Sequence, residues 1–200
     1  MFPAVSVAKG ICERYRFSFR TDISGSLIFD YNSGESEHFG ENVHLVPLNG
    51  GFWSSRLVDL NIISHIYICS SAMEAIAFIH FNSSRFSKPD GLLFIAISSC
   101  YNYPESIVRR LGKVRVNLVL GNDLIDNLRA IKFCMDYKGI QVQFLTENEQ
   151  VVFKVAERCF SLSQPGLSLR RFFLLAKIRP FFRQYIPKSK ISFLHEFLNQ

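Results

Sequence analysis

The sequence predicts an α/β protein with a mainly parallel sheet flanked by helices, a β-rich N-terminal segment and a basic helical C-terminal segment. The 200 residues are enough for one hydrophobic core of ordinary size. From residue 61 onward, short apolar runs alternate with segments of helical periodicity, and such repeats favour parallel strands joined by right-handed crossovers. The formal net charge of +6 falls entirely within residues 165–200, which sets that segment apart from the rest.

The composition is that of a globular protein, with 48% hydrophobic and 20% charged residues. No apolar run is long enough to span a bilayer, and Lys9, Glu13 and Arg14 interrupt the stretch that a secretory signal needs unbroken. Five scattered cysteines without a CxxC pair indicate buried thiols in a reducing compartment, and five dispersed histidines show no zinc-ligand spacing. We therefore expect a cytoplasmic protein.

The N-terminal segment, residues 1–60, is predicted to be rich in β-structure. Aromatic and polar residues alternate over residues 15–21, which is typical of a half-buried strand. Residues 27–31 form a second predicted strand, and the Ser-Gly-Ser sequence before it favours a hairpin turn. The polar residues 32–42 are predicted to be a loop, and residues 43–48 a further short strand.

The α/β domain is predicted to occupy residues 61–164. Apolar runs predict its strands at residues 65–69, 91–97, 114–120 and 140–145. Helical spacing and capping residues predict its helices at about residues 72–81, 104–111, 123–137 and 147–162. In a parallel sheet, ligands gather at the carboxyl ends of the strands, and here these ends are residues 69–71, 98–99 and 121–123.

Two of these strand ends carry acidic residues at the start of the following helix. Residues 66–76 read Ile-Tyr-Ile-Cys-Ser-Ser-Ala-Met-Glu-Ala-Ile, and residues 118–126 read Leu-Val-Leu-Gly-Asn-Asp-Leu-Ile-Asp. In this order, they resemble the two acidic motifs of the toprim domains of topoisomerases and primases, and the resemblance covers roughly residues 61–145. It implies that the first motif supplies a Glu for proton transfer and the second an Asp pair for Mg²⁺, which stabilises charge on a phosphodiester.

The departures from the toprim pattern fall at the chemically important positions. Ser70 and Ser71 stand where the family has Glu-Gly, and Gly121 stands where it has the first Asp of the pair. A serine hydroxyl does not act as a base near neutral pH without an activating neighbour, so catalysis in the toprim manner is not expected.

Three carboxylates remain near the two motifs, namely Glu74, Asp123 and Asp126, and they predict at most a weak Mg²⁺ site. The favoured alternative is structural: Asp123 caps the following helix, Glu74 offsets the dipole of its own helix, and Asp126 is solvated. We therefore expect either no cofactor or weakly bound Mg²⁺.

The C-terminal segment, residues 165–200, interleaves basic side chains with Phe and Tyr. The residues expected to contact an anionic partner are Arg170, Arg171, Lys177, Arg179 and Arg183. Cations beside aromatic rings suit nucleic acid, through phosphate neutralisation and base stacking. They also suit an anionic membrane surface, which we favour less, or a docking helix whose Phe side chains complete the core while Arg and Lys face water.

These observations favour a non-catalytic toprim-like protein that binds nucleic acid or supports a DNA replication or mobilisation complex. Two alternatives stay open. A Mg²⁺-dependent phosphoryl-transfer enzyme, primase-like or nuclease-like, would depend on Asp123. A protein-interaction subunit would use the basic segment to contact an acidic partner.

Overall fold

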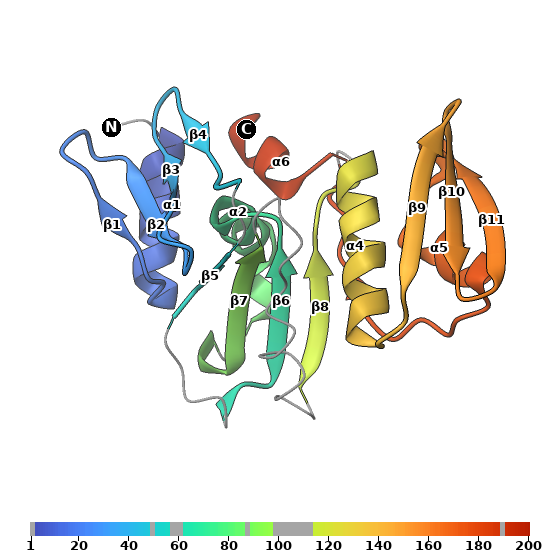
Figure 1. The fold of residues 1–200 in the computed structure, drawn as a ribbon. Helices are drawn as coiled ribbons and strands as arrows, with labels where there is room; N and C mark the ends of the chain where they lie inside the picture. Colours follow the sequence, from blue (N-terminus) through green and yellow to red (C-terminus); the bar gives the residue numbers. More distant parts are fainter. Residues whose placement is uncertain (1–2, 49–50, 57–61, 87–88, 98–113, 189–190) are drawn as a thin grey trace.

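Three β-sheets follow one another across the molecule (Figure 1). The computed structural model describes residues 3–48, 51–56, 62–86, 89–97, 114–188 and 191–200. The first sheet and its helix come from the N-terminal segment, the second is the central sheet of the α/β region, and the third is a meander that follows it in the chain.

The central sheet has five strands in the order β12-β8-β6-β7-β5. Their bounds are β5 Phe52–Ser54, β6 His65–Cys69, β7 Leu92–Ile97, β8 Arg115–Val119 and β12 Arg183–Gln184. The strands β7, β6, β8 and β12 run parallel to one another, whereas the edge strand β5 is antiparallel to β7. The strands predicted at residues 65–69, 91–97 and 114–120 are therefore confirmed, and they are neighbours in one sheet as expected.

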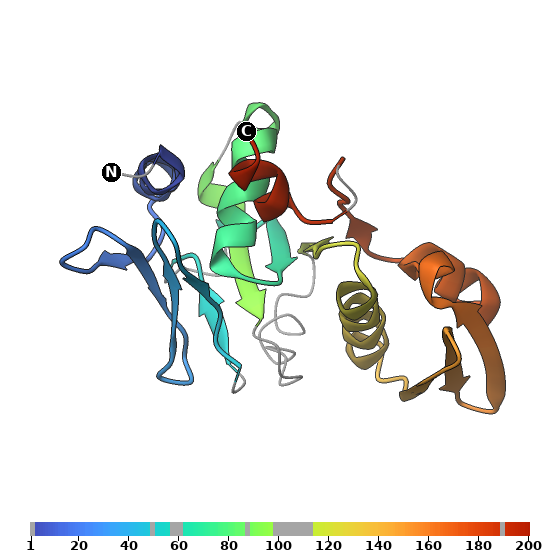
Figure 2. The same cartoon turned by 90° about the horizontal axis from the view of Figure 1, so that it is seen from above.

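Two hydrophobic clusters cover the two faces of this sheet, because side chains alternate along each strand. In β6, Tyr67 and Cys69 join one cluster, while Ile66 and Ile68 join the other. Seen from above, α2 (Ala72–Asn82) and α6 (Phe193–Leu198) lie on the first face and α4 (Leu124–Tyr137) lies on the second (Figure 2). The helices predicted at residues 72–81 and 123–137 are confirmed as α2 and α4.

The N-terminal segment begins with a helix that the β-rich prediction missed. Helix α1 spans Pro3–Tyr15 and buries Val5, Ala8, Cys12 and Tyr15, whose spacing is helical. It ends at Arg16, which has a left-handed φ of 56°, and the Phe17 N–H bonds back to the Cys12 carbonyl. Most of the strand predicted at residues 15–21 is therefore helix end and connection.

An antiparallel sheet follows α1 in the order β1-β2-β3-β4. Its strands are β1 Arg20–Thr21, β2 Leu27–Asp30, β3 Ser36–Phe39 and β4 His44–Leu45. The strand predicted at residues 27–31 is confirmed, and β4 lies inside the one predicted at residues 43–48. The loop predicted at residues 32–42 is wrong in part, because it contains β3.

The third sheet is an antiparallel meander in the order β11-β10-β9. Its strands are β9 Val142–Glu147, β10 Gln150–Val155 and β11 Arg158–Ser163. Helix α5 (Leu169–Ala176) packs against the face formed by Val151 and Phe153. Three short 3₁₀ helices complete the elements of the described residues, at Ser83–Arg85, Pro89–Gly91 and Gln164–Gly166.

The prediction of a mainly parallel sheet flanked by helices is wrong: two of the three sheets are antiparallel throughout, and the central one is mixed. The run at residues 140–145 does form a strand, but β9 pairs with β10 and not with β8. Asn148 and Glu149 have left-handed φ angles of 46° and 60°, so a two-residue turn reverses the chain directly.

The same turn excludes the helix predicted at residues 147–162. Within β10 the burial alternates with period two, with Val151, Phe153 and Val155 buried, as in a strand covered on one face. The helix predicted at residues 104–111 and the strand end at residues 98–99 lie outside the described residues.

Candidate functional site

The two strand ends that resemble toprim motifs lie together in the structure. Strands β6 and β8 are parallel neighbours, so residues after Cys69 and Val119 emerge at the same edge of the sheet. A cavity of about 380 Å³ lies there. It is lined by Ser70, Ser71, Glu74, Asp123 and Asp126, together with further residues of α4, residues of β4 and the chain after it, and residues at the start of α6. The expectation that these residues come together is confirmed.

Glu74 belongs to α2, but its carboxylate caps a different helix. Its two oxygens accept hydrogen bonds from the backbone N–H groups of Phe193 (2.7 Å) and Leu194 (2.9 Å), in the first turn of α6. The residue is only 1% exposed. The pKa of Glu74 is raised to about 7, because burial and, less strongly, the nearby Asp126 raise it by more than the two N–H donors lower it. Glu74 stands in the first turn of α2, as expected for a residue that offsets the dipole of that helix, but nothing in the sequence indicated that its carboxylate also caps α6.

Asp123 has the structural role that the sequence predicted for it. Its Oδ1 accepts a hydrogen bond from the backbone N–H of Asp126 at 2.7 Å, which makes it the N-cap of α4. The side chain is exposed at the rim of the cavity.

Asp126 is 7% exposed, so the expectation that it is solvated is wrong. It forms an ion pair with Arg129 at 3.1 Å. Burial is the largest influence on the pKa of Asp126 and raises it, the charge of Asp123 adds to this, and Arg129 opposes both. The Asp126 carboxylate also fills the space beside Gly121, because a Cβ atom at position 121 would lie 2.2 Å from Oδ2 of Asp126. Position 121, where the resemblance led us to expect an Asp, therefore has no room for a side chain in this arrangement.

The sequence reasoning missed a fourth carboxylate at this end of the sheet. Glu37 of β3 is fully buried, and its carboxylate accepts hydrogen bonds from the N–H groups of Ala72 (2.7 Å) and Met73 (3.0 Å) at the start of α2. The Tyr31 hydroxyl (2.8 Å) and His44 Nε2 (2.9 Å) contact the same carboxylate. Glu37 lies in a polar stretch without clear periodicity, so no local signal distinguishes it from a loop residue.

The three carboxylates of this cavity are engaged by groups of the protein, two of them by the N–H groups of helix ends. Both oxygens of Glu74 bond α6, Asp123 caps α4, and Asp126 contacts Arg129, so the set does not fit a Mg²⁺ site, which needs carboxylate oxygens directed at the ion. Within the described part of the chain, no group of three His, Cys, Asp or Glu side chains could hold a metal ion. Among the same residues, none accepts a hydrogen bond from the Ser70 hydroxyl, so this serine has no activating base there.

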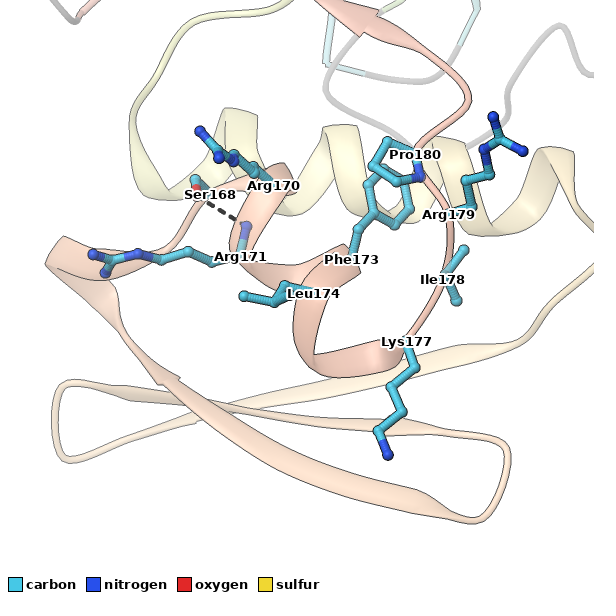
Figure 3. Close-up of a pocket in the computed structure, with 9 residues that line it drawn as sticks. All are labelled: Ser168, Arg170, Arg171, Phe173, Leu174, Lys177, Ile178, Arg179 and Pro180. Atoms are coloured by element: carbon cyan, nitrogen blue, oxygen red, sulfur yellow. Dashed lines mark hydrogen bonds between the residues drawn. The ribbon is translucent and has the colours of Figure 1, made fainter.

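Four of the five basic residues singled out in the sequence surround helix α5. Arg170, Arg171, Lys177 and Arg179 line a hollow of about 580 Å³ together with Ser168, Phe173, Leu174, Ile178 and Pro180. Figure 3 shows the cationic side chains extending in different directions, with the apolar side chains between them. We call this surface the α5 groove.

The electrostatics of the α5 groove are one-sided, because its described lining contains no acidic residue. All four cationic side chains are exposed, and Leu174 between them is 75% exposed. Arg171 donates a hydrogen bond to the Gly166 carbonyl (3.1 Å), and the Ser168 hydroxyl caps α5 by accepting one from the Arg171 N–H (3.3 Å). Diverging charges on an open surface suit an extended polyanion better than a single small anion, which needs converging donors.

The fifth basic residue, Arg183, lies elsewhere. It belongs to β12 at the edge of the central sheet, and its guanidinium stands 4.7 Å from the centre of the Tyr185 ring. Several aromatic residues of the C-terminal segment point into the core: Phe172 and Phe173 of α5 are buried, and so are Phe193 and Phe197 of α6. The expectation that Phe side chains of this segment complete the core is confirmed for these four.

Comparisons with protein-family models, with curated proteins and with solved structures find no match for this chain. Among the helices of the described residues, none combines the length and the apolar character needed to cross a membrane. The functional argument therefore depends on the two surfaces described above.

Proposed function

We propose that this protein binds nucleic acid through the α5 groove and does not catalyse phosphoryl transfer. The observation on which the proposal depends is the charge of that surface: four exposed cations, apolar side chains between them and no acidic residue in the described lining. Phosphates of a nucleic acid supply regularly spaced negative charges, and neutralising them releases counterions.

The cavity at the strand ends supports the non-catalytic part of the proposal. There Ser70 and Gly121 replace two acidic residues of the toprim pattern, and Glu74 is engaged by the backbone of α6. A degenerate toprim-like unit of this kind would hold its partner without cleaving or joining it. We place the protein in the cytoplasm, in a replication or mobilisation complex, and the buried free thiols of Cys12, Cys69 and Cys134 suit a reducing compartment.

The proposal is tested by measuring the affinity for a fluorescent DNA duplex and the matching single strand at several salt concentrations. With four phosphate contacts, the logarithm of the affinity should fall with the logarithm of salt with a slope of about −3 to −4. The double variant Arg170→Glu/Arg179→Glu should bind at least about tenfold more weakly and show a shallower slope.

A control residue is available on the sheet against which α5 packs. Lys154 of β10 is exposed on the face opposite to α5, because its neighbours Phe153 and Val155 point toward the core. The variant Lys154→Glu changes the net charge in the same sense and should leave the affinity within about twofold. Equal losses in the control and the double variant would refute a specific role for the α5 groove, and binding without salt dependence would refute the nucleic-acid proposal.

A further inference from the structure

A second basic surface lies at the opposite end of the central sheet from the strand-end cavity. Two hollows of about 500 and 490 Å³ share His65, Arg183 and Tyr185 in their linings. His65 begins β6, Arg115 begins β8 and Arg183 begins β12, so the hollows lie at the amino ends of these parallel strands. We call the pair the β12 groove. Each hollow is within the size range of small-ligand sites.

The charge of the β12 groove has one sign. Arg85 and Arg183 line the first hollow, while Arg115, Lys138 and Arg183 line the second, and neither described lining includes an acidic residue. The four cationic side chains are exposed, and none of them forms an ion pair with a described carboxylate. An anionic ligand is therefore favoured over a cationic or neutral one.

Aromatic rings form much of the remaining lining. The first hollow is lined by Tyr67, Phe78, Phe86 and Tyr185, and the second by Tyr137, Phe181, Phe182 and Tyr185. Tyr67 and Phe78 are buried in the core, whereas the other five rings are partly exposed and available to a ligand. Two of the cations stand on ring faces, with Arg183 4.7 Å from the centre of Tyr185 and Lys138 4.5 Å from the centre of Phe181. Rings alternating with cations match a ligand that has both a flat base and a phosphate.

A polar atom without a partner points to a specific contact. The Nδ1 atom of His65, a residue that lines both hollows, is buried and has no hydrogen-bond partner among the described residues. This atom loses hydration on folding, so a ligand that bonds it restores the lost hydrogen bond. The pKa of His65 is lowered by burial and by the charge of Arg115, which keeps the ring neutral near pH 7 and able to bond the edge of a base.

We propose that the β12 groove binds one unpaired nucleotide, with its base against the aromatic rings and its phosphate between Arg183 and Lys138. This deepens the proposed function, on which it rests, because the segment from Arg179 to Tyr185 connects the α5 groove with the β12 groove along the chain. A single strand can present such a nucleotide, whereas a duplex keeps its bases stacked inside.

The test uses the full chain with a single-stranded oligothymidylate of about 12 nucleotides, the matching duplex, and thymidine 5′-monophosphate alone. Some thymines of the strand are replaced by 5-iodouracil, which crosslinks to an adjacent aromatic ring on irradiation. Crosslinks are expected on Tyr137 or on residues 181–185 with the single strand and not with the duplex. The double variant Lys138→Gln/Arg183→Gln should weaken single-strand binding about tenfold and leave duplex binding unchanged, while Lys154→Gln should change neither.

The three ligands distinguish a failure of this inference from a failure of the proposed function. Binding of the monophosphate that is lost in Arg183→Gln supports the groove as a site for a free nucleotide. If the single strand binds but crosslinks only around α5, and if its affinity is the same for the Lys138→Gln/Arg183→Gln variant, the inference is overturned and the proposed function stands. No binding of strand, duplex or monophosphate overturns both. Thermal unfolding of each variant, expected to match that of the parent protein, excludes a loss caused by misfolding.

Discussion

The buried carboxylate of Glu74 makes a quantitative prediction about stability and pH. The pKa of this group is about 7 in the folded protein, against an ordinary value of 4.5. Between these values the folded state binds the proton more tightly than the unfolded state does, so the free energy of unfolding falls as the pH rises through this window. Over the whole window, this difference in pKa lowers the free energy of unfolding by about 3 kcal/mol.

The perturbation is Glu74→Gln, which removes the titration and keeps the size of the side chain. Asp126 has a raised pKa too and acts in the same direction, so only the difference between the two proteins isolates Glu74. The stability of the variant relative to the parent should rise by about 3 kcal/mol from about pH 4 to about pH 8. The exposed change Glu157→Gln, in the turn between β10 and β11, serves as a control for the loss of a surface carboxylate, and it should change the free energy of unfolding by less than about 0.5 kcal/mol.

The assay is urea denaturation at a series of pH values, followed by the fluorescence of Trp53. This single tryptophan is 1% exposed and belongs to the same hydrophobic cluster as α2, which carries Glu74. A relative stability that stays flat with pH would refute the reasoning. A relative stability that falls as pH rises would show that the N–H donors of Phe193 and Leu194 outweigh burial and keep the carboxylate ionised.

Three further predictions concern the same end of the sheet and helix α5. Gly121→Ala should destabilise the protein by about 1–3 kcal/mol, because the new Cβ would lie 2.2 Å from the Asp126 carboxylate and 2.7 Å from a backbone carbonyl. The control Gly10→Ala, with nothing within 4 Å, should be neutral or stabilising by up to about 1 kcal/mol in the same denaturation experiment. Glu37→Gln should lower the free energy of unfolding by about 1–3 kcal/mol, because one amide cannot accept hydrogen bonds from all the donors around it. A decrease of less than about 0.5 kcal/mol, which is the size expected for a surface substitution, would contradict this role. Ser168→Ala should cost about 1 kcal/mol through loss of the α5 cap, and unchanged urea denaturation would argue that the cap is not formed.

Part of the candidate site was predictable because its causes are local in sequence. Ser71 and Asp123 each stand at the boundary between an apolar run and a helical pattern, and each side-chain oxygen bonds an N–H only three residues ahead. The convergence of the two strand ends followed from the strand–helix–strand order alone, since parallel strands end at one edge. The basic character of α5 was visible as charge in the sequence.

The failures in the third sheet concern the partner of one strand and a period-two pattern that the helix prediction overlooked. Residues 140–145 were correctly predicted as a strand, but an apolar run does not determine its partner, and the left-handed turn at Asn148 and Glu149 decided the pairing. The helix predicted at residues 147–162 is wrong because Val151, Phe153 and Val155 alternate with exposed residues, which is the period of a half-buried strand.

By itself, then, the sequence determined the capped helices, the apolar strands and the concentration of positive charge in the C-terminal segment, because these depend on neighbours a few residues apart. Tertiary structure alone decided which helix end each carboxylate serves. Glu37 reaches α2 across 35 residues and Glu74 reaches α6 across 119, so the burial and the partners of each acid were set by which backbone N–H groups the fold brought beside it. Tertiary structure also separates Arg183 from the other four basic residues, because the chain after α5 crosses to the edge of the central sheet, where β12 pairs with β8.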